Sequence, residues 1–109
     1  MYGLSTRRRY EPVVCKDGFK MSVQAGEGLY SHPRCEAESY TKVEIGFPNK
    51  AESLLAEYAE DKVGCPTDTV YPYVPAKLVL EVIKKHGGMV SGELPAVDYV
   101  ALILKLTNL

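Results

Sequence analysis

Thr41-Lys-Val-Glu-Ile-Gly-Phe-Pro48 and Thr67-Asp-Thr-Val-Tyr-Pro-Tyr-Val-Pro75 are two β-prone segments that each end at a proline. Proline ends a strand because it has no N–H group for the next ladder bond, and it fits well in the first turn of a helix. Each segment is followed by apolar residues at helical spacing. The two segments therefore predict two strand-to-helix units, with aromatic residues and proline at both junctions.

The first unit predicts a half-buried strand over residues 39–47, because polar and apolar side chains alternate there. Asn49 is a suitable N-cap for the short helix that follows and ends near Glu60. The apolar side chains that share one face of this helix are Leu54, Leu55 and Tyr58. This unit therefore predicts a strand and one short amphipathic helix.

In the second unit, Pro72 removes one ladder donor from the strand, which favours an edge strand or a bulge. Pro75 opens a helix that His86-Gly87-Gly88 ends, with Lys84 and Lys85 at the negative end of the helix dipole. The apolar face of this helix consists of Leu78, Val79, Val82 and Ile83. This unit therefore predicts an edge strand followed by the chain's best-defined helix.

A β-hairpin precedes both units. Residues 12–16 and 19–24 are β-prone, and Asp17-Gly18 between them fits a two-residue type I′ turn, in which both central residues have positive φ. Phe19, Met21 and Val23 alternate with polar residues, which predicts one buried face. With the two units, the hairpin predicts an α+β fold: a small, mainly antiparallel sheet of about four strands, with two or three helices on one face.

The two ends of the chain differ from this body. Residues 1–10 include Arg7-Arg8-Arg9 and predict a flexible arm, whereas residues 95–109 form an apolar segment that fits a helix or a buried strand. So many apolar side chains at one end need a cover, either the domain's own core or a second copy of the chain. We therefore expect one domain over residues 1–109 and a homo-oligomer held through the C-terminal segment.

Composition places the chain among ordinary globular proteins. It has 109 residues, 46% hydrophobic and 25% charged, with a net charge of −1. Such a balance gives no general attraction to nucleic acid, and the longest apolar run, Tyr99–Leu104, is too short to cross a bilayer. The N-terminus carries no apolar signal segment, so three reduced cysteines in a cytoplasm are the expected state.

Two polar constellations could bind something small. Cys15, His32, Cys35 and Cys65 could hold zinc, but they lack the paired spacing of structural zinc sites, so we predict no metal and no cofactor. The second constellation surrounds a glycine-containing loop and could hold an anion or a base by hydrogen bonding and stacking. It consists of Ser22, Gln24, Tyr30, Ser31, His32 and Arg34. The alternative is a polar loop that satisfies its own backbone.

Aromatic side chains offer a surface for a protein partner, because tyrosine is enriched in binding hot spots. The chain has eight tyrosines and no tryptophan. The candidate contact residues are Tyr40, Phe47, Tyr58, Tyr71 and Tyr73, and residues 36–61 beside them hold seven acids against two lysines. Some of these tyrosines could equally be core residues at the edge of the sheet.

A string of short motifs resembles small uncharacterised proteins of tailed bacteriophages and prophages, over about residues 12–88. The motifs are Lys20-Met-Ser-Val-Gln-Ala-Gly26, Tyr30-Ser-His-Pro-Arg34, Val43-Glu-Ile-Gly-Phe-Pro48, Leu55-Ala-Glu-Tyr-Ala-Glu60 and Val70-Tyr-Pro-Tyr-Val-Pro75, followed by His86-Gly-Gly88. The resemblance implies a phage or prophage origin and the cytoplasm of a bacterial host. It supplies no catalytic residue.

Three functions stay open at this point. The first is a non-enzymatic phage protein that binds a host protein, for takeover or counter-defence. The second is a protein that binds or sequesters a small, nucleotide-like ligand through the Tyr30–Arg34 loop. The third is a small hydrolase or transferase with His32 as its base. No motif identifies a nucleophile with its base, so we expect no enzyme.

Overall fold

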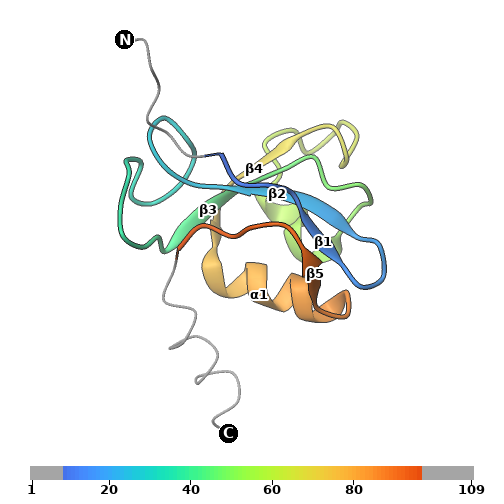
Figure 1. Cartoon of the computed structure of the whole chain (residues 1–109). Coiled ribbons are helices and arrows are strands. Elements are labelled where there is room, and N and C mark those ends of the chain that lie inside the picture. Colours follow the sequence, from blue (N-terminus) through green and yellow to red (C-terminus); the bar gives the residue numbers. More distant parts are fainter. Residues whose placement is uncertain (1–8, 97–109) are drawn as a thin grey trace, which may run out of the picture.

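The computed structural model of the protein describes residues 9–96. Five strands form one antiparallel sheet in the order β4-β3-β2-β1-β5 (Figure 1). The strands are β1 (Val13–Cys15), β2 (Lys20–Gln24), β3 (Lys42–Gly46), β4 (Val70–Pro75) and β5 (Met89–Ser91), with a 3₁₀ helix η1 (Ser53–Tyr58) and an α-helix α1 (Ala76–Lys85). The architecture is α+β, as predicted, with five strands instead of about four.

Strand pairing gathers the apolar side chains on one face of the sheet. Val13 lies opposite Met21, and Val23 lies opposite Ile45, which in turn lies opposite Tyr71. All five side chains are buried. Since successive residues of a strand point to opposite faces, the pairing that buries this set leaves the residues between them on the other face.

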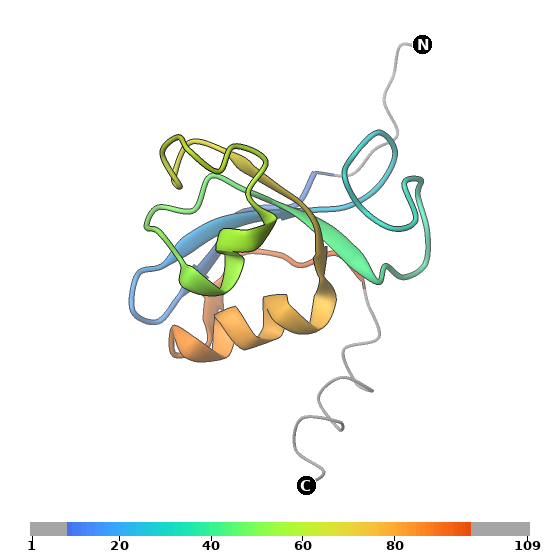
Figure 2. The same ribbon diagram turned by 180° about the vertical axis from the view of Figure 1, so that it is seen from behind.

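Both helices pack on the face that carries this core. Leu55 from η1 and Val79 and Val82 from α1 belong to the same buried cluster as the strand residues. Figure 2 shows η1 in green and α1 in orange, both on one side of the sheet. The other side has no helix among residues 9–96, and we call it the open face.

The hairpin was predicted correctly, but its loop was not. The loop has three residues, Lys16-Asp17-Gly18, closed by the Gly18 N–H bonding to the Cys15 carbonyl at 2.9 Å, and only Gly18 has positive φ. This is a type I turn followed by a left-handed glycine. The loop is shaped by contact with the end of α1, because the Asp17 N–H donates to the His86 carbonyl at 3.2 Å.

The helix α1 begins and ends where the sequence predicts. Pro75 precedes its first residue, and His86 is the C-cap. The Gly88 N–H donates to the Ile83 carbonyl at 2.9 Å and the Gly87 N–H to the Lys84 carbonyl at 3.1 Å, with Gly87 at φ 91°. This pair of bonds is the Schellman motif, which satisfies carbonyls that have no partner within the helix.

Asn49 does not cap the first helix. That helix is 3₁₀ and begins at Ser53, and Glu52 is its N-cap, with a carboxylate oxygen that accepts from the Leu54 N–H at 2.8 Å. The Asn49 side chain instead accepts from the Lys20 N–H and donates to the Gly18 carbonyl, both at 2.9 Å. These two bonds hold the segment after β3 against the hairpin, so Asn49 has no free group for a cap.

The predicted strand over residues 39–47 is shortened to Lys42–Gly46, and its ends reverse the expected faces. Tyr40 is buried, whereas Phe47 is 58% exposed. Phe47 has φ 45°, and this left-handed residue turns the chain away from the sheet. The alternation therefore holds only within the paired residues, because a face is defined only while the backbone stays extended.

The edge position that Pro72 favours is confirmed for β4. Tyr71 lies opposite Ile45 and Val74 lies opposite Val43, so Pro72 and Tyr73 together face Glu44 as a β-bulge. Tyr73 has φ 53°. On the outer side of this strand, the Tyr73 N–H donates to the Tyr30 carbonyl at 3.1 Å, so the adjacent loop covers part of the edge.

The two ends of the described chain are tied to the sheet. Tyr10 exchanges two hydrogen bonds with the Gln24 side chain, at 2.9 Å and 2.7 Å. The Tyr40 N–H donates to the Ala96 carbonyl at 2.9 Å. Residues 1–8 of the predicted flexible arm (residues 1–10) lie outside the described residues, as do the predicted C-terminal helix or strand and the predicted oligomer contact. Tyr10, at the end of the predicted arm, is buried.

Candidate functional site

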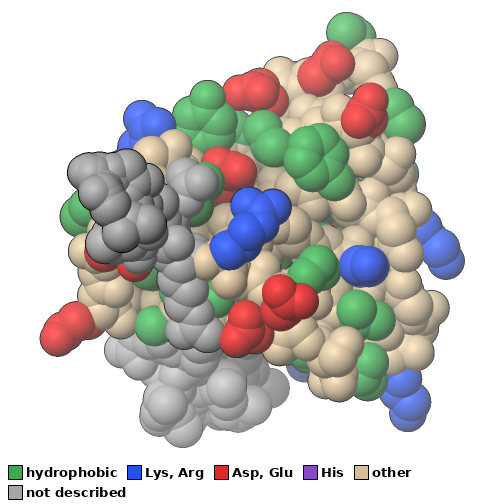
Figure 3. Space-filling view, turned by 45° about the horizontal axis from the view of Figure 1, so that its top comes forward, with side chains coloured by type: hydrophobic (Ala, Val, Ile, Leu, Met, Phe, Trp, Pro, Cys, Tyr) green, Lys and Arg blue, Asp and Glu red, His purple; other side chains and the backbone are tan. Residues whose placement is uncertain are grey.

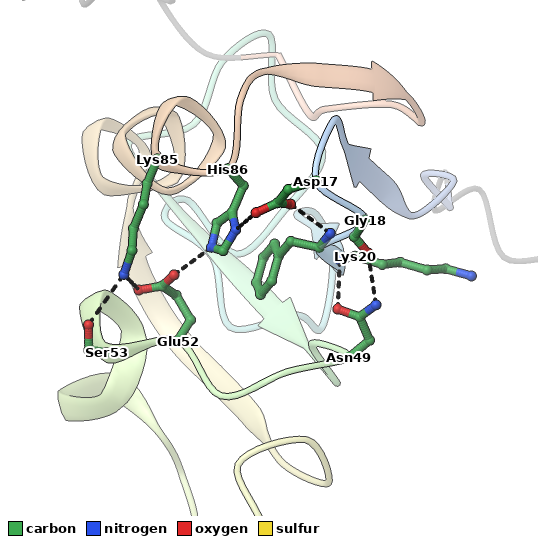
Figure 4. A network of polar contacts seen from close by, with 9 residues as sticks. Asp17, Gly18, Lys20, Asn49, Glu52, Ser53, Lys85 and His86 are labelled. Carbon is green, nitrogen blue, oxygen red and sulfur yellow. Dashed lines mark hydrogen bonds and ion pairs between the residues drawn. The ribbon is translucent and has the colours of Figure 1, made fainter.

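His86 lies between two carboxylates (Figure 4). Its Nδ1 is 2.6 Å from Asp17 Oδ2, and its Nε2 is 2.6 Å from Glu52 Oε1. Lys85 Nζ donates to the other carboxylate oxygen of Glu52 at 2.8 Å and to Ser53 Oγ at 3.4 Å. These five residues form one network, which we call the His86 network.

Three parts of the chain supply this network. Asp17 comes from the hairpin loop, Glu52 from the N-cap of η1, and His86 from the C-cap of α1. The imidazole stacks on Phe19, with ring centroids 4.1 Å apart and planes 12° apart. The network therefore joins two helix ends to the hairpin directly over the core.

The carboxylates set the charge of the network. Burial disfavours the charged form of His86, but the hydrogen bonds to Asp17 and Glu52 outweigh it and raise the pKa of His86. Burial likewise opposes ionisation of Glu52, yet the bonds from Lys85, the Leu54 N–H and His86 lower the pKa of Glu52. The Phe19 N–H and then His86 lower the pKa of Asp17. The arrangement favours an imidazolium between two carboxylates.

This geometry is unsuited to acid–base chemistry on a substrate. A general base needs a nitrogen that can reach a substrate proton, and both ring nitrogens of His86 already face carboxylates. Lys85 beside Ser53 resembles a serine–lysine pair, but Lys85 donates to Glu52 as an ammonium group and has no lone pair for the serine proton. The network therefore acts as an internal clamp.

A pocket of about 440 Å³ opens beside the network, between η1 and the loop that follows it. Lys85, Glu52 and Ser53 form a polar part of its wall, and Ala56 and Pro66 are among the apolar lining residues. The volume is in the range of sites for small organic molecules. Sequence reasoning did not find this pocket, because its lining residues have no shared local pattern.

The open face carries a second candidate site. Phe47 and Tyr73 are the only residues other than glycine with positive φ in the described chain, at 45° and 53°. They are 58% and 39% exposed. Phe47 borders a shallow hollow of about 180 Å³ together with Ser22 and Gly46. Bulky residues rarely adopt this conformation, so the two aromatic side chains are held outward at a cost in backbone strain.

Figure 3 shows the open face obliquely, with hydrophobic side chains between charged ones. Acidic side chains gather beside hydrophobic ones along one rim of this view. The segment from η1 to β4 holds four exposed acids, and no ion pair joins them to a cation in residues 9–96. These acids, which we call the acidic rim, are Glu57 on η1 and Glu60, Asp61 and Asp68 between η1 and β4, with Lys62 among them.

The loop residues predicted to bind a ligand are occupied by bonds within the protein. Arg34 donates to the Leu29 and Gly28 carbonyls, at 3.0 Å and 3.3 Å, and lies over the Tyr30 ring at 5.3 Å. Gln24 Nε2 donates to Ser22 Oγ at 3.0 Å and also to the Tyr10 carbonyl. The loop therefore satisfies its own backbone, which was the alternative interpretation. His32 is exposed and pairs through its backbone with Lys42.

The tyrosines predicted to contact a partner separate into two groups. Tyr40 and Tyr71 are buried, at 4% and 2% exposed, so the prediction that they contact a partner is wrong. Tyr71 is internal because the bulge of β4 turns it toward Ile45, and its hydroxyl donates to the Pro66 carbonyl at 2.5 Å. Tyr58 is partly buried against the core. Tyr73 is the member of the predicted set with the clearest exposure, beside the Tyr30 ring at 5.8 Å.

The three cysteines are free and separate. Cys15 is buried, which raises its pKa, whereas Cys35 and Cys65 are exposed. Hydrogen bonds from Thr67 lower the pKa of the Cys65 thiol. No group of three or more histidine, cysteine or acidic side chains in residues 9–96 is placed to hold a metal ion.

Within the described residues, neither helix has the length and apolar character needed to cross a membrane. Comparison of the chain with protein-family models, with curated proteins and with solved structures finds no match.

Proposed function

We propose that the protein is a non-enzymatic binding protein that holds a partner protein on its open face. The observation that carries the proposal is the pair Phe47 and Tyr73, which are exposed although each sits in a left-handed backbone conformation. Neither side chain fills the core, so packing does not account for the strain. Strain of this kind gathers at sites where a side chain must be presented in one direction.

The surroundings of these aromatic residues fit a protein interface. Phe47 stands beside a hollow whose floor includes Gly46, so a side chain from a partner can approach the backbone there. Large aromatic anchors next to a recess, surrounded by polar residues, are the usual centre of a binding surface. Lys20 also borders the hollow and supplies a cationic donor beside it.

The acidic rim defines the kind of partner. Four exposed carboxylates without cationic partners in the described chain attract a basic surface and speed its association. We therefore propose a partner that presents an apolar centre with lysine or arginine at its edge. On the expectation of a phage or prophage origin, we propose that this partner is a protein of a bacterial host, bound for takeover or counter-defence.

A stoichiometric role is supported by the His86 network. Its histidine and lysine, the groups best suited to proton transfer, are bound to Asp17 and Glu52. A binding protein needs only a rigid surface, and the network supplies rigidity by fixing both helices to the hairpin. The same residues would have to be released before they could act on a substrate.

The test is capture from a bacterial lysate by the immobilised full chain and two variants. Phe47→Ser removes the anchor, and Val90→Ser is the matched control, because Val90 is 63% exposed on β5, at the opposite edge of the sheet from β4. We expect one basic protein in about equimolar amount on the wild type and V90S, lost from F47S and released when salt rises from about 0.1 M to about 1 M.

Circular dichroism should show the same fold for all three proteins. Capture of the same proteins by F47S would contradict the proposal, and so would retention that is unchanged at high salt. Conversion of a lysate component by a catalytic amount of the protein would show an enzyme instead.

A further inference from the structure

We infer that the pocket beside η1 binds a small organic carboxylate, with the carboxylate group on Lys85 and Ser53. This second site lies beside η1, shares Asp61 with the acidic rim, and goes beyond the proposed protein binding. The pocket has a volume of about 440 Å³. A ligand of modest size fits that volume, and the wall next to the His86 network supplies its polar recognition.

Lys85 and Ser53 keep donors that the His86 network does not use. A lysine ammonium has three N–H groups, and Lys85 uses two, one to Glu52 and a long one to Ser53. The Ser53 hydroxyl accepts that bond, and its own O–H has no acceptor among the described residues. One N–H and one O–H therefore stand side by side at the pocket wall, which suits the two oxygens of a carboxylate.

Glu52 does not cancel this attraction. Its side chain is 1% exposed, and its two oxygens are occupied by His86 on one side and by Lys85 and the Leu54 N–H on the other. The His86 network thus holds two cationic groups and two carboxylates, and Lys85 keeps one N–H group that no described residue accepts. A charge-assisted bond from Lys85 to a bound anion is stronger than a neutral hydrogen bond.

The remaining lining restricts the ligand further. Ala51, Ala56, Ala59 and Pro66 give the pocket an apolar surface, which favours a ligand with an apolar body. Asp61 also lines the pocket, and its Oδ1 already accepts from the Val63 and Gly64 N–H groups. Asp61 repels any bound anion, and it repels a doubly charged one more strongly than a singly charged one. A singly charged carboxylate is therefore favoured over a doubly charged phosphate monoester.

The test titrates the isotope-labelled full chain with benzoate and follows its amide signals by NMR. Three control compounds are titrated in the same way. Benzamide lacks the charge of benzoate, phenyl phosphate carries two negative charges, and formate has the carboxylate without an apolar body. We expect benzoate to shift the amides of Ser53, Ala56 and Gly64 in a saturable way. Each of the other three probes should bind at least about tenfold more weakly, a difference of about 1.4 kcal/mol.

Three variants locate the site. Lys85→Gln and Ser53→Ala each remove one donor, and Ala56→Leu fills the pocket while leaving every charge in place. Lys84→Gln is the control, because Lys84 is exposed next to Lys85 but does not line the pocket. We expect benzoate affinity to fall at least about fivefold in K85Q, S53A and A56L and to stay unchanged in K84Q.

The inference is wrong if benzoate gives no saturable shift, or if K84Q weakens binding as much as K85Q. It is also wrong if formate or phenyl phosphate binds as tightly as benzoate. Should K85Q be too unstable to titrate, S53A and A56L still decide the question, because neither variant removes a partner of Glu52.

Discussion

The two phenylalanines of the chain represent two different regions of one sheet. Phe19 is 1% exposed and stacks on His86 against the helix-covered face, whereas Phe47 is 58% exposed on the open face. The same side chain thus has two roles. On the covered face it is bound to a fixed neighbour, and on the open face it is presented outward by a strained backbone. Substitutions on the covered face should change stability, and those on the open face should change binding.

The largest expected effect is on the covered face. Phe19→Ala should lower the free energy of unfolding by about 3–5 kcal/mol, because it leaves a cavity under the His86 ring. Phe47→Ala should change it by less than about 0.5 kcal/mol, since the side chain is exposed. Urea unfolding followed by circular dichroism measures both values. A similar loss of unfolding free energy in the two variants would contradict the proposed difference between the covered face and the open face.

A smaller loss is expected when the clamp is removed. His86→Gln leaves Asp17 and Glu52 without a cation between them, and should lower the free energy of unfolding by about 2 kcal/mol. Lys84 lies two residues before His86 and is exposed, so the free energy of unfolding of Lys84→Gln should stay within about 0.5 kcal/mol of the wild-type value. Equal stability of H86Q and the wild type would mean that the clamp contributes nothing.

The contribution of the His86 network to stability should depend on pH. Because the folded pKa of His86 is raised above its ordinary 6.5, its stabilisation is complete below pH 6.5 and is lost as pH rises through the folded value. The lowered pKa values of Asp17 and Glu52 act in the opposite direction, so their stabilisation is lost as acid protonates them.

Unfolding curves at a series of pH values test this. Besides the two carboxylates, Lys85 and, more distantly, Lys50 lie close enough to act on these groups. The wild type should lose stability from pH 6.5 upward, and H86Q should not. A wild-type profile that rises above pH 6.5 would contradict the assigned charges.

The smallest effect has the opposite sign. Phe47→Asn places a residue that tolerates the left-handed region at φ 45°, and should raise the free energy of unfolding by up to about 1 kcal/mol. The same variant should lose the partner on the open face. Calorimetry measures the stability and the capture experiment measures the binding. An F47N variant that is less stable than the wild type and still binds the partner would refute the claim that the strain at Phe47 serves binding.

Local signals in the sequence explain which parts of the fold could be predicted. The end of α1 was predictable because His86-Gly87-Gly88 forms a motif within three residues. The hairpin was predictable for the same reason, although its loop type depends on the distant end of α1. The strand β5 was missed because its three residues are all exposed and show no alternation.

The candidate sites could not be predicted, because they depend on contacts between residues far apart in the sequence and on backbone strain. A local sequence pattern shows neither. Asp17 and Glu52 are separated from His86 by 69 and 34 positions, and no local pattern in the sequence links the three residues. Phe47 was identified as a candidate contact residue, but its positive φ was not expected, because bulky residues rarely adopt it. Arg34 was predicted to bind a ligand. Its hydrogen bonds to carbonyls of its own loop could not be predicted from the sequence.

The position of β1 controls when the sheet can be completed during synthesis. Among the strands of residues 9–96, β1 is made before the others, yet it lies between β2 and β5, which is made after the others. The β1–β2 hairpin can form early, but the other edge of β1 stays unpaired until Met89–Ser91 has been made. A nascent chain that stalls before Met89 therefore offers an open strand edge to other chains, which makes aggregation its characteristic failure.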